Sequence, residues 1–309
     1  MTRTLLLGTL LLATTALPAA AQGRYRDDGR RFGDGDDAPS RLDTTVTLAR
    51  GGTVSLGLRS GDIVVTTWDR NEVRVKATVE NGRVRFDATP SRVNVDNSDA
   101  SGDTRYEVTV PVGARVSART ANGDVKVSGT GGPVDARTQN GDISVSGANG
   151  HVELGALRGD ITARDLQGDL AVNTISGDVT VDGMSGDINV EAVSGDLVLR
   201  RVTARNVRAH STSGDVSYAG TIAADGRYDL ASHSGDLRLE MPRDASAQLS
   251  VSTWNGTIDS DFPITLEPGE HGIGLTNSKH FTFSVGGGAA RVTLESFSGD
   301  ITIRRRDAR

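Results

Sequence analysis

Aspartates follow glycines at a regular spacing through the central part of the chain. A column of carboxylates could bind calcium, which takes oxygen ligands, or could accept hydrogen bonds from backbone amides at turns. Calcium-binding β-rolls carry a second glycine and a later aspartate in each unit, whereas the aspartate here follows the first glycine directly. The pattern therefore favours turn capping over specific calcium binding. These residues are Asp124, Asp142, Asp160, Asp178, Asp196, Asp215 and Asp236.

The elements that must position these carboxylates are short strands. A glycine stands at every ninth position from Gly123 to Gly195. Apolar residues follow at the third and fifth positions of each unit, as Val179 and Val181 do, which is the alternation of a strand with one buried face. A strand of about five residues and a turn fill each unit and leave no room for a helix. We therefore predict an all-β fold, a single-chain parallel β-solenoid.

Alternate glycines of the series are not equivalent. One set, the strict edge, keeps Asp after the glycine through Gly235 and keeps Ser or Thr three residues before most of its glycines. The other set, the permissive edge, lapses after Gly186, where Ala204 takes the next place. The repeating coil is therefore 18 to 21 residues long. An apolar residue two places before the glycine, such as Ile175 or Met184, breaks the alternation and could face either the core or solvent.

Composition narrows the possible functions. The 34 basic and 40 acidic residues make the chain mildly acidic, which argues against nucleic acid as a partner. Aromatic residues are only 4% of the chain, which argues against a large carbohydrate site. The absence of cysteine excludes disulfides and thiolate metal sites.

The first residues predict export. Residues 1–21 carry an early Arg3, an apolar run and small residues before Gln22, which is the pattern of a signal peptide cleaved after Ala21. We therefore expect a periplasmic or secreted protein with no transmembrane segment in the mature chain. Residues 22–41 are charged and glycine-rich, and we expect them to be a disordered linker.

The remaining candidates for a site are histidines and aromatic residues. The five histidines show no metal-ligand spacing, and we predict neither a metal site nor a cofactor site. Two places before successive strict-edge glycines stand His233, Trp254 and Phe297. They could form a ligand-facing stripe, but packing that closes the end of the solenoid is the favoured interpretation, as it is for Trp68 at the other end. The histidines are His151, His210, His233, His271 and His280.

Catalytic motifs are missing from the sequence. No nucleophile elbow and no phosphate-binding glycine loop occurs. The outward strand positions that we compared, among them Thr162, Ala171 and Asn189, show no cluster of Asp, Arg and Lys. We therefore predict no catalytic residues and no enzyme, with a polysaccharide-processing β-helix enzyme as an alternative.

Several segments together resemble a known family. The segment from Ser60 to Ala77, the Val-Pro lead-in at Val110, the repeated Ser-Gly-Asp units and the closing segment from Val292 to Ile303 are similar to the DUF4097 family of candidate adhesins. The resemblance extends over roughly residues 42–306. It implies an exported or envelope-associated bacterial protein with a parallel β-helix or β-roll fold and no established catalytic residues.

These observations predict a non-catalytic structural or interaction protein, adhesin-like or associated with the cell envelope, that binds a protein, a glycan or an envelope component. A calcium-stiffened β-roll is a further alternative. We also expect the basic residues Arg304, Arg305 and Arg306 to shield the last exposed strand edge. The predicted parts are the signal peptide 1–21, the linker 22–41 and the solenoid 42–309, which divides into irregular coils 42–119, regular coils 120–261 and closing coils 262–309.

Overall fold

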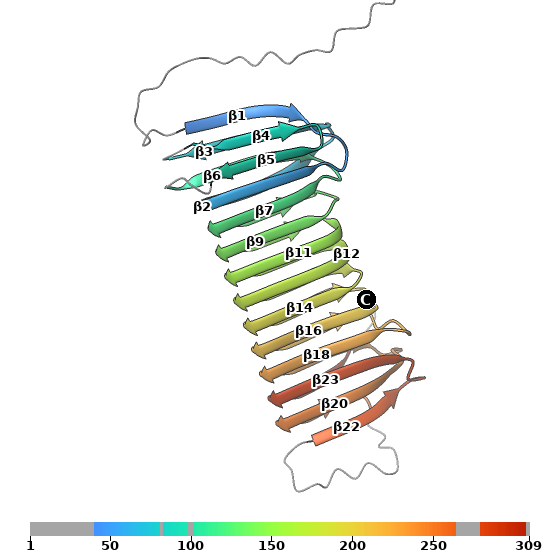
Figure 1. Cartoon of the computed structure of the whole chain (residues 1–309). Helices are drawn as coiled ribbons and strands as arrows, with labels where there is room; N and C mark the ends of the chain where they lie inside the picture. Colours follow the sequence, from blue (N-terminus) through green and yellow to red (C-terminus); the bar gives the residue numbers. More distant parts are fainter. Residues whose placement is uncertain (1–39, 81–82, 98–101, 264–278, 307–309) are drawn as a thin grey trace, which may run out of the picture. The chain divides into compact units, whose positions relative to one another are not determined.

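A computed structural model describes residues 40–80, 83–97, 102–263 and 279–306. Every regular element among these residues is a β-strand, as predicted, and the strands are hydrogen-bonded into a single 24-stranded sheet (Figure 1). None of the described segments forms a helix suited to spanning a lipid bilayer. The signal peptide and nearly all of the linker lie outside the described residues. Ser40 and Arg41, which we had assigned to the linker, begin the first strand.

The sheet folds into two faces joined at the glycine corners. Strands that run into the strict edge form the leading face, and strands that leave it form the trailing face. The leading strands are β7 (Arg115–Asn122), β9 (Val134–Asn140), β11 (Asn149–Arg158), β14 (Ile188–Ser194), β16 (Asn206–Ser213), β18 (Arg227–Ser234), β20 (Ala247–Asn255) and β23 (Ala290–Ser298). The trailing strands are β8 (Val125–Ser128), β10 (Ile143–Ser146), β13 (Val179–Ser185), β15 (Leu197–Val202), β17 (Val216–Gly220), β19 (Leu237–Pro242), β21 (Ile258–Ser260) and β24 (Ile301–Arg306). The long strand β12 (Ile161–Ser176) bends through the permissive edge and serves both faces.

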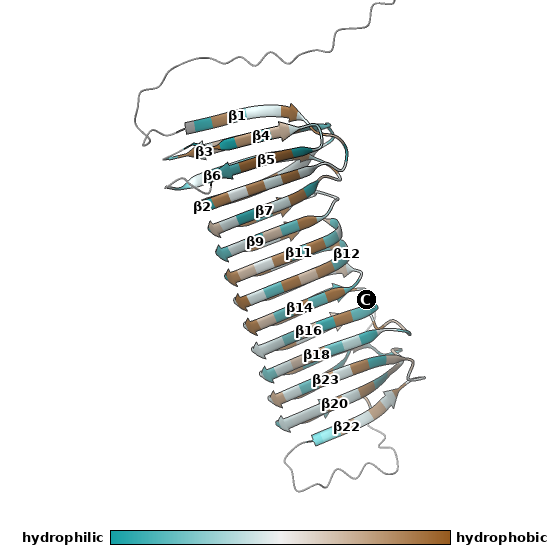
Figure 2. Ribbon diagram, in the orientation of Figure 1, coloured by the Kyte–Doolittle hydropathy of each residue, from teal (hydrophilic) through white to brown (hydrophobic). Residues whose placement is uncertain are grey.

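Successive coils pair in parallel with a register that confirms the predicted period. Val179 lies opposite Ile161 on one side and Leu197 on the other, each 18 residues away. Inward positions carry Val, Ile, Leu and Ala and are almost completely buried between the two faces. Hydrophobic and hydrophilic residues therefore alternate along single strands (Figure 2). Burial of these aliphatic side chains is the main stabilising contribution to the stack.

The final coil of the chain is inserted out of order. β23 pairs in parallel with β18 on one side and with β20 on the other, and β24 likewise lies between β19 and β21 (Figure 1). β22 (Lys279–Val285) pairs antiparallel with β20 and ends the leading face. The basic segment Arg304–Arg306 therefore lies opposite Glu240–Pro242 inside the stack, and our prediction that it shields the last edge is wrong. Position in the sequence alone does not give the order of coils in space.

The N-terminal end shows the same departure from chain order. β2 (Thr53–Trp68) spans one whole coil and lies between the coil β5–β6 and the coil β7–β8. Antiparallel strands complete this end: β1 and β3 on the trailing face, β4 on the leading face. Trp68 is half-buried there and donates a hydrogen bond from Nε1 to the Glu72 carbonyl (2.6 Å), within the turn that leads from β2 to β3. The remaining bounds are β1 (Ser40–Thr47), β3 (Glu72–Val79), β4 (Arg85–Thr89), β5 (Arg92–Asn97) and β6 (Thr104–Pro111).

Candidate functional site

The aspartates of the strict edge cap the backbone of the neighbouring coil. Oδ1 of each aspartate accepts a hydrogen bond from the backbone N–H at the same position one coil further, for example Asp178 from Asp196 (2.9 Å). The series crosses the inserted coil without a break, since Asp236 accepts from Asp300 N–H (2.8 Å) and Asp300 accepts from Thr257 N–H (2.7 Å). The turn-capping prediction is therefore confirmed. We call this series the carboxylate column: Asp62, Asp124, Asp142, Asp160, Asp178, Asp196, Asp215, Asp236 and Asp300.

The hydrogen bonds explain how like charges are held one coil apart. The Thr257 amide holds the pKa of Asp300 below its ordinary value, because a donated hydrogen bond stabilises the charged form. Coulomb repulsion between neighbours at about 5 Å is roughly 1 kcal/mol in water, similar to what one hydrogen bond contributes. No group of three or more His, Asp or Glu side chains in the described part of the chain converges as a metal site.

The strict edge requires glycine because the coils approach closely at the corner. Gly177 has a φ of +136°, and a Cβ atom there would lie 2.1 Å from the carbonyl oxygen of Gly159. The carbonyl group of a strict-edge glycine also accepts a hydrogen bond from an inward hydroxyl group. Ser232 Oγ, for example, donates to the Gly214 carbonyl at 2.9 Å. The Ser or Thr three places before the glycine is therefore a second part of the corner.

The permissive edge uses a different solution once its glycines end. Gly168 and Gly186 stack as the strict glycines do, but the next coils are longer and place two buried tyrosines in the widened core. Tyr228 donates to the Ala204 carbonyl (2.7 Å) and accepts from the Ala223 amide (2.8 Å), and Tyr218 donates to the Thr221 carbonyl (2.8 Å).

Burial raises the pKa of both hydroxyls. Our sequence reasoning missed these tyrosines. The signal that could have found them is an aromatic residue at an inward position in the coils where the glycine is lost.

The apolar residue two places before the glycine points in opposite directions at the two edges. On the strict edge Ile175 and Val193 are about half exposed (50% and 51%), whereas Met184 on the permissive edge is buried (2%). At the strict edge the inward place is taken by the preceding hydroxyl or small residue, such as Thr174. The strict edge therefore presents a row of outward side chains. We call it the ridge: Leu157, Ile175, Val193, Thr212, His233, Phe297 and Trp254, in spatial order.

Three aromatic rings form one end of the ridge. Because β23 is inserted between β18 and β20, Phe297 lies between His233 and Trp254. Its ring stacks on His233 with centroids 4.8 Å apart and on Trp254 with centroids 6.0 Å apart. Phe297 and Trp254 remain 46% and 41% exposed, so the favoured interpretation of these residues as closing packing is wrong. They form an outward stripe.

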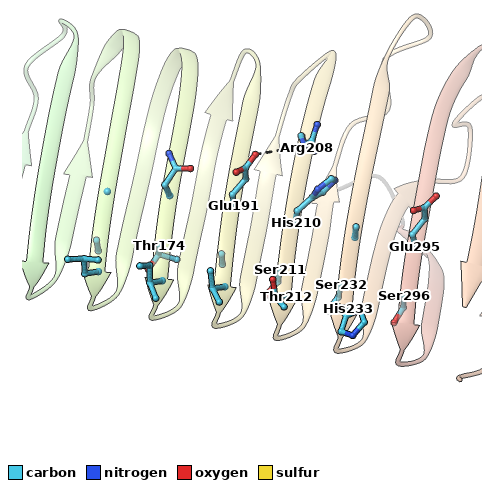
Figure 3. A pocket seen from close by; sticks show the side chains of 18 of the residues that line it. Thr174, Glu191, Arg208, His210, Ser211, Thr212, Ser232, His233, Glu295 and Ser296 are labelled. Carbon is cyan, nitrogen blue, oxygen red and sulfur yellow. Dashed lines mark ion pairs between the residues drawn. The ribbon is translucent and has the colours of Figure 1, made fainter. Parts of the chain in front are cut away.

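A groove of about 1200 Å³ runs beside the ridge along the leading face. Figure 3 shows Glu191, His210 and Glu295 on this side of the leading strands, with the ridge residues Thr212 and His233 near the strict corner. At its N-terminal end the charges are mutually paired, as Arg137 lies 2.6 Å from Glu153 and 3.2 Å from Asp135.

Titratable side chains meet near the middle of the groove. Glu191 and Arg208 lie 4.0 Å apart on β14 and β16 (Figure 3). His210 Nε2 lies 3.1 Å from Asp229 Oδ2 on the next coil. The expectation that outward positions hold no acid and base cluster is therefore wrong. The comparison of outward positions had left out the row to which Glu191 and His210 belong. Such a group can exchange protons with a ligand or pair with its charges.

The other predicted site residues are scattered. His151 is exposed on β11 and His280 is exposed on β22, and neither lines the groove. His271 lies outside the described residues. Of the four histidines that the structure describes, His210 and His233 line the groove.

Comparisons with known proteins complete the description. The model of the Toastrack DUF4097 family matches residues 128–304. Among solved structures, a candidate adhesin from Parabacteroides distasonis is 10% identical over 88% of this chain and 98% of its own, with a TM-score of 0.45. A candidate adhesin from Bacteroides fragilis is 8% identical over 86% and 97%, with a TM-score of 0.41. A candidate cell adhesion protein from Clostridium sporogenes is 11% identical over 87% and 100%, with a TM-score of 0.24. A comparison with curated proteins gave no match.

Proposed function

The chain belongs to the Toastrack DUF4097 family, and on that premise we propose that it is a non-catalytic, exported interaction protein that binds a partner protein along the ridge and groove. An adhesin-like role at the cell envelope is the finer form of this proposal. The site residues are then those of the ridge, and the carboxylate column holds the ridge in register.

The observation that carries the proposal is the distribution of exposed apolar side chains. Six large apolar residues of the described chain are exposed, and five of them lie on the ridge, the sixth being Val112. Scattered exposed apolar residues need no explanation, but a contiguous row beside a groove is typical of an interaction site. Water would be released from this row on binding, which favours association.

The ring geometry supports a protein partner over a sugar. Sugars stack on the flat faces of aromatic rings, whereas Phe297 has its faces against His233 and Trp254, with interplanar angles of 11° and 10°. The inner ring of the stripe, that of Phe297, therefore offers mainly its edge to a ligand. Ring edges packed among aliphatic side chains are typical of protein interfaces.

A capture experiment with matched variants tests the proposal. The mature protein carries Ile175→Thr and Val193→Thr in one variant and Val112→Thr in the control, since threonine is well tolerated in strands. We expect a partner from the native envelope fraction to be retained by wild type and control but lost from the ridge variant. Equal retention by all three would contradict the proposed site.

Export has its own test. N-terminal sequencing of protein recovered from the periplasm or the medium should begin at Gln22. An uncleaved Met1 on protein that stays in the cytoplasm would contradict export.

The cluster around His210 favours one second candidate, a polysaccharide-processing enzyme. A base and a guanidinium on the outward face of a β-solenoid are groups that such chemistry uses. The test is a panel of bacterial glycans assayed for new chain ends with wild type and with His210→Gln. Activity that is lost in the variant would support an enzyme. If wild type is inactive on every glycan of the panel, the enzyme candidate is contradicted and the binding function remains as the proposal.

A further inference from the structure

We propose that the groove docks one α-helix of a partner protein, and that this helix carries an apolar stripe with basic residues on both sides. This inference rests on the binding function proposed above and names the chemistry of the partner. It is carried by the arrangement of charge around the ridge.

The ridge sets the shape of the ligand. It is one side chain wide and extends over seven coils, from Leu157 to Trp254. Six intervals of about 4.8 Å give a length of about 29 Å. A helix of about 19 residues has this length at 1.5 Å per residue. Its apolar stripe, repeating every three to four residues, matches a row of single side chains.

The first flank of the ridge is the carboxylate column. It lies three residues further along the chain, around the strict corner, and its aspartates are exposed. Each carboxylate uses Oδ1 for the neighbouring amide, and no hydrogen bond or ion pair from the described residues reaches Oδ2 of Asp178, Asp196 or Asp215. These three oxygens, beside Ile175, Val193 and Thr212, remain available to a cationic partner.

The second flank is the outward row of the leading face. Within the groove this row carries two carboxylates, Glu191 beside Val193 and Glu295 beside Phe297, and the Arg208 guanidinium lies 4.0 Å from Glu191. No ion pair from the described residues reaches Glu295. The apolar ridge therefore has a carboxylate on each side at two coils: Glu191 and Asp196 beside Val193, and Glu295 and Asp300 beside Phe297. Toward the N-terminal end of the groove the carboxylates of Asp135 and Glu153 already pair with Arg137, so they are not available to a cationic partner.

This double border selects among classes of ligand. An extended strand directs alternate side chains to opposite sides, so it does not place basic groups on both sides of one apolar row. Anionic lipid surfaces and acidic glycans are repelled by the carboxylates. An amphipathic helix presents an apolar stripe between two polar borders, and helix-in-groove recognition uses this geometry.

The experiment compares three labelled 20-residue peptides for binding to the mature protein by fluorescence anisotropy. One is a Leu/Lys helix with apolar residues at helical spacing, the second replaces Lys with Glu in the same pattern, and the third alternates Leu and Lys as a strand would. We expect the Leu/Lys helix to bind at least tenfold more tightly than the other two and to weaken as salt rises. Equal binding of the Leu/Glu helix or of the alternating peptide would overturn the proposal.

Variants locate the binding on the protein. Glu191→Gln with Glu295→Gln should weaken the Leu/Lys helix by about fivefold, while Glu240→Gln on the trailing face should not. Ile175→Thr with Val193→Thr should weaken it further. Circular dichroism and thermal melting of each variant show that the fold is retained. If no peptide binds but the ridge variant still loses its partner in the capture experiment, the helix proposal fails and the proposed function stands. If that loss is also missing, both fail.

Discussion

The strict and the permissive edge of the solenoid both turn the chain between its two faces, but they use different residues to do so. Each must turn the chain while neighbouring coils stay about 4.8 Å apart. The strict edge repeats one corner of glycine and a capping carboxylate, and it does so even where the coils are out of chain order. The permissive edge uses glycine only up to Gly186 and then buried tyrosines, and it accommodates the longer coils. Among the coils from β7–β8 to β18–β19, variation in length is thus confined to the permissive edge, and the strict edge stays regular enough to present a continuous ridge.

The largest expected effect comes from adding a methyl group at the strict edge. In Gly159→Ala the new Cβ would lie 2.0 Å from the Gly141 carbonyl oxygen, at a φ of +132°. We expect the free energy of unfolding to fall by at least about 3 kcal/mol, from strain and from separation of the coils. Urea unfolding of the mature protein measures it.

The control is Gly150→Ala on the permissive edge. There a Cβ meets only the Pro133 ring at 3.5 Å, although φ is +91°. A loss of about 1 kcal/mol is expected from the backbone alone. Equal losses in the two variants would contradict the explanation that close approach of the coils at Gly159 requires glycine.

The next effect belongs to the tyrosines of the permissive edge. Tyr228→Phe leaves the Ala204 carbonyl and the Ala223 amide without their partner, so we expect a loss of roughly 2 kcal/mol. Tyr218→Phe removes a single bond, to the Thr221 carbonyl, and should cost about half as much. Denaturant unfolding of both variants checks the order, and a larger loss at Tyr218 would contradict it.

Alkaline pH should lower the free energy of unfolding through ionisation of a buried tyrosine at the permissive edge. Burial raises the pKa of Tyr218 above its ordinary value of 10 in the folded state. Below pH 10 the neutral hydroxyl is present in both states, and its stabilising contribution is complete. Above pH 10 only the unfolded chain ionises, so the free energy of unfolding falls by up to about 1.4 kcal/mol per pH unit for this group. Between pH 9 and 12 the free energy of unfolding should fall less steeply with pH for Tyr218→Phe than for wild type. For Asp178→Asn it should fall as steeply as for wild type.

The smallest effect separates hydrogen bonding from charge in the carboxylate column. Asp178→Ala removes the acceptor of the Asp196 amide and should cost about 1 kcal/mol. Asp178→Asn keeps an oxygen in place and removes repulsion from two neighbours, so stability should be unchanged or slightly higher. Thermal melting at low and high salt distinguishes the two variants. A loss for Asn as large as for Ala would show that the negative charge itself is needed.

The corner chemistry and the coil could be predicted from the sequence because both depend on local geometry. Gly177 needs a positive φ, Asp178 has an amide within reach, and Val179 and Val181 alternate as a buried strand does. The side of the ridge could not be predicted, because Ile175 and Met184 are both apolar and both stand two places before a glycine of the repeat. Only the residue that fills the inward place at each corner decides which of them is exposed.

The order of the last coils could not be predicted for a related reason. Ser298, Gly299 and Asp300 form the same corner as every other coil, and their hydrogen bonds fit any neighbour with that corner. A motif that stacks on all of its copies contains no information about which copy lies next to it. The aromatic stripe was missed as a consequence, because Phe297 lies between His233 and Trp254 only when β23 is inserted.

That insertion also separates the order of synthesis from the order of assembly. From β7–β8 onward each coil can stack on the coil made just before it, as far as β18–β19. β20–β21 is made next but its permanent neighbour is the coil formed by residues 290–306, which is made later. The stack therefore pauses with an open end until those residues arrive, and the exposed edge of β18 and β19 is a hazard during this interval. Completion of the stack, and with it the aromatic end of the ridge, depends on the last segment to be made.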